Sequence, residues 1–325
     1  MKTANHFIHR NARSFTTLLA LILIILVFSI MSPRYFKYDN LIDIINQGVV
    51  NGFLACGMTV AIITGGIDLS VGSCMAVVIV TCAELSSHGV PTPLVIPAGL
   101  LVGVVIGCIN GFLVTRMKLQ PFIATLGTNQ IFRGLAYIIS GGQPVLNMQL
   151  SLRSVFQTEI VRGVRLNMIY LLILAVIFSV ILTRRRAGVY IYAIGSNVNA
   201  SRMSGINVEK YLMVAYIMCS VGAAMAGMVT LARLGTGEPT AGDGFETMAI
   251  AAAAIGGTSL AGGKGAIPGT ILGAFTISAL KIGLVVIGMD TFYQFIAIGL
   301  IIIFATYMDT LQGIVTSALS RKKHQ

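Results

Sequence analysis

The sequence predicts an all-α membrane protein that crosses a lipid bilayer about ten times. Hydrophobic residues make up 56% of the 325-residue chain and charged residues only 10%, whereas about a quarter of the residues in a soluble domain are charged. Uncharged stretches at 16–30, 94–114 and 168–182 reach or approach the roughly 20 residues that span a hydrocarbon core. We therefore expect residues 1–325 to form a single transmembrane domain, with the bundle at 14–320.

Turns and charges divide the chain into the expected spans. The first, at 15–31, follows three basic residues as the core of a signal peptide would. It ends in Ser-Pro-Arg without a small-x-small cleavage site, so we expect it to be retained as a span. The others are expected at 48–64, 69–85, 94–115, 121–140, 166–183, 211–233, 245–260, 267–288 and 291–308.

Basic residues are distributed unevenly between the two sides that these spans define. Ten spans put both ends of the chain on one side, and that side holds fourteen basic residues against six on the other. The fourteen are Lys2, Arg10, Arg13, Arg116, Lys118, Arg184, Arg185, Arg186, Arg202, Lys210, Lys264, Arg321, Lys322 and Lys323. Because basic residues are enriched in cytoplasmic loops, we expect both termini in the cytoplasm. The net charge of +11 then reflects topology and attraction to membrane lipid, and we expect no nucleic-acid partner.

The fourth span carries a regular stripe of glycine. Gly99, Gly103, Gly107 and Gly111 recur every four residues, which puts them on one face of a helix. A stripe of small residues lets another helix backbone approach closely. The sequence therefore predicts a tightly packed bundle.

Three polar, glycine-rich stretches interrupt the apolar pattern, at 64–73, 124–133 and 255–265. Irregular backbone at membrane depth is tolerated only where it is buried in protein or lines a wet path. We therefore expect a translocation path there, although Arg133 could instead extend to the membrane surface. The candidate path residues are Thr64, Asp68, Ser70, Thr125, Asn129 and Arg133.

The sequence excludes several kinds of catalytic site. The stretch at 255–265 resembles a nucleotide-binding P-loop, but Thr258 replaces its first glycine and Gly265 follows Lys264 where Ser or Thr is required. The four histidines lie at the termini or in one loop, and the five cysteines lie in apolar stretches. Neither set has the spacing of a metal site or a catalytic pair. We expect no cofactor, no metal and no enzymatic activity in this chain.

A polar segment at 184–210 separates the sixth and seventh expected spans. Ser196 and Asn197 are helix-capping residues, and Gly205 is a helix stop. These signals predict a short helix on the cytoplasmic surface. Such a helix could receive the movement of an external motor, although an ordinary positively charged loop is the alternative.

Four blocks resemble the permease subunits of ribose-type monosaccharide ABC importers. They are GGIDLSVGS at 65–73, the segment 190–207, PTAG at 239–242 and GGTSLAGGKG at 256–265. The resemblance extends over nearly the whole chain. It implies a type II ABC importer-like permease bundle in a bacterial inner membrane, moving ribose, allose or a similar pentose or hexose from periplasm to cytoplasm.

The resemblance also implies partners. These are a second permease copy, two ABC ATPase subunits that hydrolyse ATP, and a periplasmic sugar-binding protein, for which the outer segments 141–165 and 233–246 are candidate docking sites. By the same resemblance, 184–210 is the cytoplasmic coupling segment, and its candidate ATPase-coupling residues are Gly195, Ser196, Asn197, Ala200, Arg202 and Gly205.

One alternative is a secondary transporter driven by an ion gradient. In that case Asp68, Arg133 and Lys281 would be the coupling charges, since ionisable groups inside spans mark ion pathways. Uptake would then survive the loss of ATP. The sequence does not specify the sugar, because an importer of this design selects mainly at its binding protein.

Overall fold

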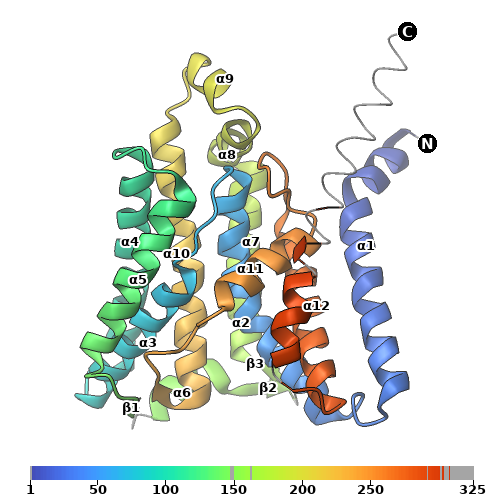
Figure 1. Ribbon diagram of the computed structural model, residues 1–325, viewed down its shortest axis with the longest axis vertical. Coiled ribbons are helices and arrows are strands. Elements are labelled where there is room, and N and C mark those ends of the chain that lie inside the picture. The colour runs from blue at the N-terminus through green and yellow to red at the C-terminus, as the bar shows by residue number, and fades with distance from the viewer. Residues whose placement is uncertain are drawn as a thin grey trace.

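The computed structural model is a bundle of helices (Figure 1) and describes residues 2–146, 150–161, 163–290, 292–300, 302, 303 and 307, with side chains from residue 16 onward. The long and medium helices are α1 (Lys2–Met31), α2 (Tyr38–Ile63), α3 (Val71–Ser87), α4 (Thr92–Thr115), α5 (Pro121–Ile139), α7 (Leu166–Arg184), α10 (Val208–Leu234), α11 (Phe245–Ile255) and α12 (Ile267–Val286). Three short helices are α6 (Leu150–Gln157), α8 (Arg186–Ser196) and α9 (Val198–Met203).

Within the described residues, five helices are long and apolar enough to cross a membrane: α2, α4, α7, α10 and α12. Shorter apolar helices cover Thr16–Met31, Val71–Ser87 and Phe245–Ile255. The protein is thus a mainly helical membrane protein, as predicted. The expected span at 291–308 is described only in part, and the basic residues at 321–323 lie outside the described residues.

Three expected spans differ clearly from the helices at one end. Helix α1 begins at Lys2 rather than at 15. Helix α2 begins at Tyr38 rather than at 48, because the intervening residues form an amphipathic start to the helix. Helix α11 ends at Ile255 rather than at 260. Gly257, with φ +85°, takes a left-handed conformation that only glycine adopts readily, and the chain leaves the helix there.

The two ends of the bundle are built differently. The α8 end carries α8 and α9, and the start of α1 lies on the same side (Figure 1). The opposite end, here the α6 end, carries α6 and four short strands (Figure 1). Strand β1 (Val145–Leu146) pairs with β4 (Thr236–Gly237), and β2 (Glu159–Val161) pairs with β3 (Val164–Arg165), both antiparallel.

The centre of the bundle is α2, which is buried along most of its apolar length and packs against α10, α11 and α12. The predicted glycine stripe packs α4 directly onto α10. A methyl group at Gly107 would lie 2.6 Å from Ile217 Cα, and one at Gly103 would lie 2.7 Å from Ala224 Cβ. The expectation of a tightly packed helix pair is confirmed, because no side chain fits between the two backbones.

Candidate functional site

The two irregular loops that flank α2 and α11 meet at α8. The loop at 64–70 follows α2, and the loop at 256–266 joins α11 to α12. The amide of Gly263 donates a hydrogen bond to the carbonyl of Ile63 at 2.9 Å. Both of these backbone groups lie against Gly195 of α8, at a distance that leaves no room for a Cβ atom. Helix α8 thus contacts the end of α2 and the loop at 256–266 at one point.

A second contact joins α8 to the loop at 256–266. The hydroxyl of Tyr192 donates a hydrogen bond to the carbonyl of Gly265 at 2.7 Å. Burial raises the pKa of the Tyr192 phenol above its ordinary value, so the hydroxyl keeps its proton and remains a donor at neutral pH. The contacts of Tyr192 and Gly195 lie one helical turn apart on the same face.

The remaining candidate coupling residues are exposed. Asn197 has an extended backbone that separates α8 from α9, and its side chain accepts a hydrogen bond from the amide of Ala200 at 2.9 Å. Gly205 follows α9 with φ +78°. The predicted short helix is confirmed as α9, which Asn197 caps and Gly205 follows. Ser196, also expected to cap it, is instead the last residue of α8. The exposed residues of the set are Ser196, Asn197, Ala200, Arg202 and Gly205.

Three of the candidate path residues form one buried hydrogen-bond network. The Asp68 carboxylate accepts from the amide of Ser70 at 2.9 Å and from its hydroxyl at 2.6 Å. Asn110 of α4 donates to Ser70 Oγ at 2.7 Å and accepts from Thr128 of α5 at 2.7 Å. Thr125 Oγ1 accepts from the amide of Leu69 at 3.1 Å. The side chains of Asp68, Ser70 and Thr125 are fully buried, so the network fixes the loop at 64–70 against α4 and α5.

Asn129 and Arg133 lie further along α5 and are half-buried. Arg133 Nη1 donates hydrogen bonds to the carbonyls of Pro239 at 2.7 Å and Ala241 at 2.9 Å. The guanidinium therefore ties α5 to the segment between β4 and α11. This is a polar contact inside the protein rather than an extension to the membrane surface.

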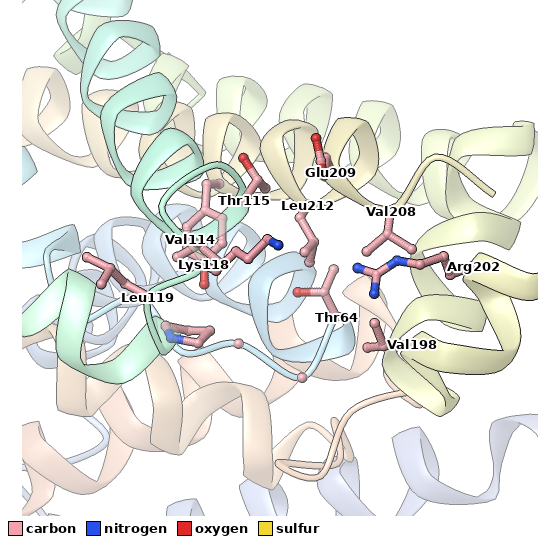
Figure 2. Close-up of a pocket in the computed structure, with 14 residues that line it drawn as sticks. Thr64, Val114, Thr115, Lys118, Leu119, Val198, Arg202, Val208, Glu209 and Leu212 are labelled. Atoms are coloured by element: carbon pink, nitrogen blue, oxygen red, sulfur yellow. The ribbon is translucent and has the colours of Figure 1, made fainter.

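Thr64 lies apart from the network, at the wall of a cavity of about 410 Å³ at the α8 end. Its hydroxyl donates to the carbonyl of Ala61 at 2.7 Å. Figure 2 shows Lys118 and Arg202 pointing toward the centre of this cavity from two sides, with Thr64 between them. One candidate path residue and one candidate coupling residue, Arg202, thus line the same cavity.

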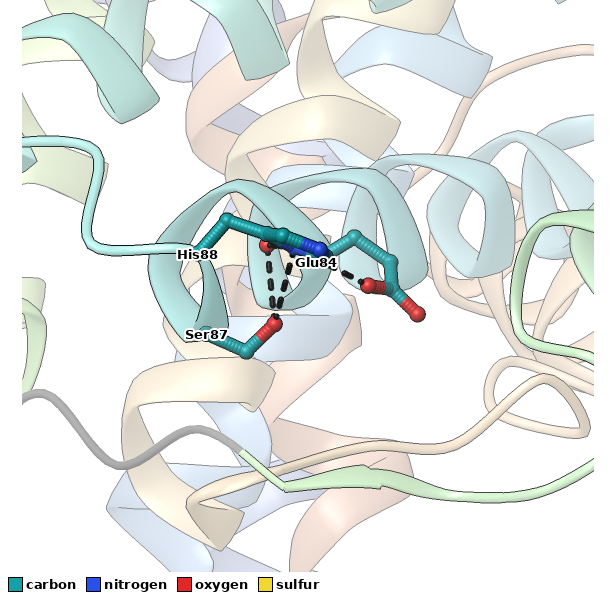
Figure 3. Close-up of polar contacts among 3 residues, drawn as sticks. All are labelled: Glu84, Ser87 and His88. Carbon is teal, nitrogen blue, oxygen red and sulfur yellow. Dashed lines mark hydrogen bonds and ion pairs between the residues drawn. The ribbon is translucent and has the colours of Figure 1, made fainter.

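The ionisable pair Glu84 and His88 lies within one helical turn at the end of α3, with His88 exposed and Glu84 half-buried (Figure 3). His88 Nδ1 lies 2.8 Å from the carbonyl of Glu84 and 3.5 Å from its carboxylate, and Ser87 Oγ donates to the same carbonyl at 2.9 Å. These contacts satisfy the last turn of a helix. No group of three metal-ligating side chains occurs among the described residues.

Three residues of the site were not predicted from the sequence. Asn110 and Thr128 belong to the buried hydrogen-bond network, and Tyr216 lines the cavity. Asn110 sits beside the last glycine of the stripe in an otherwise apolar span. A single carboxamide at membrane depth is a signal that an interhelical hydrogen bond is required. Its partners could not be inferred, because they come from α5 and from the loop at 64–70.

Comparisons with known proteins agree over most of the chain. The family profile described as the permease component of branched-chain amino acid transport systems matches residues 40–306. The D-allose transport system permease protein of Escherichia coli K12 is 41% identical over 297 residues, which cover 91% of this chain and 91% of that protein. The ribose import permease protein of the same strain is 38% identical over 296 residues, covering 90% and 92%.

A more distant relative is the fructose import permease protein of Rhizobium meliloti, 31% identical over 318 residues, covering 95% of this chain and 88% of that protein. No solved structure matches the chain at a significant level. Nothing in these matches supports the ion-gradient alternative. The chain therefore belongs to the family of permease components of ABC import systems, and within it to the ribose-type sugar permeases.

Proposed function

We propose that this chain is half of the membrane path of an ATP-driven importer that moves a monosaccharide from periplasm to cytoplasm. The observation that carries the proposal is the contact of α8 with both the end of α2 and the loop at 256–266, through Gly195 and Tyr192. A push on α8 from outside the bundle reaches both the end of α2 and the link between α11 and α12. The sugar itself undergoes no chemistry, and transport is a switch between two packings of the bundle.

In this proposal, the α8 end is cytoplasmic and about ten spans place both termini there. The described basic residues at the α8 end include Arg116, Lys118 and the run at 184–186, whereas fewer lie at the α6 end. Cytoplasmic loops are enriched in Lys and Arg. The start of α1 at the α8 end supports the same orientation (Figure 1).

The ATPase subunit then binds the exposed side of α8 and α9, within the coupling segment 184–210. Ser196, Asn197, Ala200 and Gly205 are available to it because they are exposed. Arg202 is also exposed, at the point where α9 borders the cavity. Gly195 contributes from the other side, by allowing α8 to touch the two loops. The segments at the α6 end, 141–165 and 233–246, are the corresponding surface for a periplasmic sugar-binding protein.

A second copy of the chain would cover α5. Gly127 and Gly134 have open space where a Cβ would stand, Gln130 is exposed, and Ile138 is 78% exposed. A carboxamide facing lipid is unfavourable, and small residues favour close helix contact. The half-buried Asn129 and Arg133 would then border a path between the two copies, while Asp68, Ser70 and Thr125 hold its wall in place.

Ribose and allose are the first sugars to test, because the relatives named for them are the more similar ones. The experiment is uptake of each labelled sugar into proteoliposomes that contain the chain with its ATPase and binding protein. We expect uptake that requires ATP and is indifferent to a protonophore. Uptake that proceeds without ATP and stops when the proton gradient collapses would overturn the proposal.

Coupling is tested at Gly205, which the chain needs for its left-handed turn after α9. Gly205→Val places a β-branched residue at φ +78°, where it is strained, whereas Gly205→Asn is a matched control because Asn tolerates this region. We expect the transporter that contains the valine variant to hydrolyse ATP at its ATPase subunits without moving sugar. The transporter that contains the asparagine variant should still move sugar. Equal transport by both variants would count against a role for this turn.

A further inference from the structure

The cavity at the α8 end lies where four parts of the fold meet. Its walls come from the loop at 64–66, the turn between α4 and α5, helix α9, and the start of α10. At about 410 Å³ it is within the range of small-molecule sites, roughly 300–1,000 Å³. None of the interactions described for transport explains why these parts leave a space between them.

One buried polar group faces this cavity without a partner. Tyr216 lines the cavity and its side chain is 0% exposed. Its hydroxyl has no hydrogen-bond partner among the described residues. A methyl group at Gly66, another lining residue, would lie 2.6 Å from that hydroxyl, which places the oxygen at the cavity wall. Buried hydroxyls are almost always satisfied, so this one lacks the partner that a ligand in the cavity would supply.

Two cations extend into the same space. Figure 2 shows the side chains of Lys118 and Arg202 directed at each other across the cavity. Neither forms an ion pair within the described part of the chain, whereas the carboxylate of the lining residue Glu209 is paired with Arg116 at 3.2 Å. The unpaired charge inside the cavity is therefore positive.

The backbone at Lys118 is unusual. Lys118 has φ +56° and is the one described non-glycine residue with positive φ. A lysine in the left-handed region is uncommon, and glycine or asparagine is the usual residue after a helix. A cation in this strained conformation points to a role for its charge.

From these groups we infer that the cavity binds a small phosphate ester. Lys118 and Arg202 would hold the phosphate oxygens, and the Tyr216 hydroxyl would donate one further hydrogen bond. The same chemistry could come from a soluble sugar phosphate or from the headgroup of an anionic lipid. The ligand would bridge α9 to the turn between α4 and α5, so its binding opposes any movement of α9 away from that turn. This regulatory consequence rests on the proposed function of α8 and α9, whereas the binding itself does not.

Binding is tested on the purified full chain in a detergent that contains no phosphate, with ribose 5-phosphate, inorganic phosphate and ribose as probes. We expect saturable binding of ribose 5-phosphate, weaker binding of inorganic phosphate and none of ribose. Nanodiscs with and without phosphatidylglycerol identify the source. Competition by this lipid assigns the site to a headgroup, and its absence assigns the site to a soluble ester. Equal affinity for ribose and ribose 5-phosphate would make the cavity the inner end of the sugar path and overturn the inference.

The variants are chosen to preserve the fold. Lys118→Asn removes the charge but tolerates the left-handed backbone, and Tyr216→Phe removes one oxygen that has no partner. We expect about tenfold and about fivefold weaker binding of ribose 5-phosphate, since hydrogen bonds to charged groups are the stronger ones. Lys210→Asn is the matched control, because Lys210 does not line the cavity, and should stay within about twofold. Unchanged affinity in both test variants, with unaltered melting temperatures, would refute the site.

The regulatory consequence has its own test in the assembled transporter. Saturating ribose 5-phosphate should slow sugar-stimulated ATP hydrolysis at least threefold in the wild type and have little effect in Lys118→Asn. Binding without any effect on hydrolysis would leave the site in place and refute its link to α9. Loss of sugar-stimulated hydrolysis in every variant and without ligand would instead refute the proposed function.

Discussion

Replacement of Gly195 by alanine should disconnect α8 from the bundle. The added methyl group would overlap the Ile63 carbonyl oxygen and lie 2.7 Å from the Gly263 amide nitrogen. Both are backbone atoms, so neither can rotate away as a side chain would. Restoring an ordinary separation of about 3.5 Å requires α8 to move outward by roughly 0.8 Å from Gly263, and by more from Ile63.

The energy follows from the same contacts. Overpacking of this kind costs about 1–3 kcal/mol, whereas the hydrogen bond between the Gly263 amide and the Ile63 carbonyl is kept, because neither group belongs to α8. A loss of about 2 kcal/mol lowers the population of seated α8 roughly thirtyfold relative to the displaced form. The variant should reach the membrane, and the ATPase assembled with it should still hydrolyse ATP, with sugar moved per ATP reduced at least tenfold.

The assay is the ratio of sugar uptake to ATP hydrolysis in proteoliposomes. Gly299→Ala is the matched control, because its methyl group would enter open space. We expect the control to match the wild type in both quantities. A Gly195→Ala protein with a wild-type ratio and a wild-type melting temperature would refute the reasoning, because it would show that the contact transmits nothing.

Three further predictions concern the packing that supports this contact. Gly107→Ala should lower the free energy of unfolding by about 1–3 kcal/mol, seen as a lower melting temperature in detergent, because its methyl group would lie 2.6 Å from Ile217 Cα. Asn110→Ala should cost about 1–3 kcal/mol and expose the loop at 64–70 to faster hydrogen exchange, since the Asp68–Ser70 pair would lose its α4 donor. Tyr192→Phe removes the hydrogen bond to the Gly265 carbonyl. It should reduce sugar uptake per ATP two- to fivefold and lower the melting temperature by at most a few degrees. An unaltered ratio of uptake to ATP hydrolysis would assign the hydroxyl to stability alone.

The helices could be predicted from the sequence because each depends on its own composition. Uncharged stretches of sufficient length, bounded by glycine, proline or charge, identified the helices to within a few residues at most ends. The close contact of α4 with α10 was also predictable as a property of one stripe, although the partner helix was not. The four-residue spacing was enough to identify Gly107 as a contact residue, but not to identify Ile217 as its neighbour.

The candidate site was predictable only in part, because its contacts join distant segments. Asn197 and Gly205 predict a helix because they are typical residues at helix ends, and the structure places α9 between them. Nothing local indicates that Gly195 must fit between Ile63 and Gly263, which are far from it in sequence. Lys118 likewise looks like an ordinary loop lysine until its left-handed backbone and the cavity beside it are known.

The central claim is that the ATPase binds at α8 and α9, and crosslinking tests it most directly. A photoreactive residue at Ala200, exposed on α9, should crosslink to the ATPase in the assembled transporter. The same residue at Arg153, exposed on α6 at the opposite end, should not. Crosslinks to the ATPase from position 153, or none from position 200 in an active complex, would contradict the account.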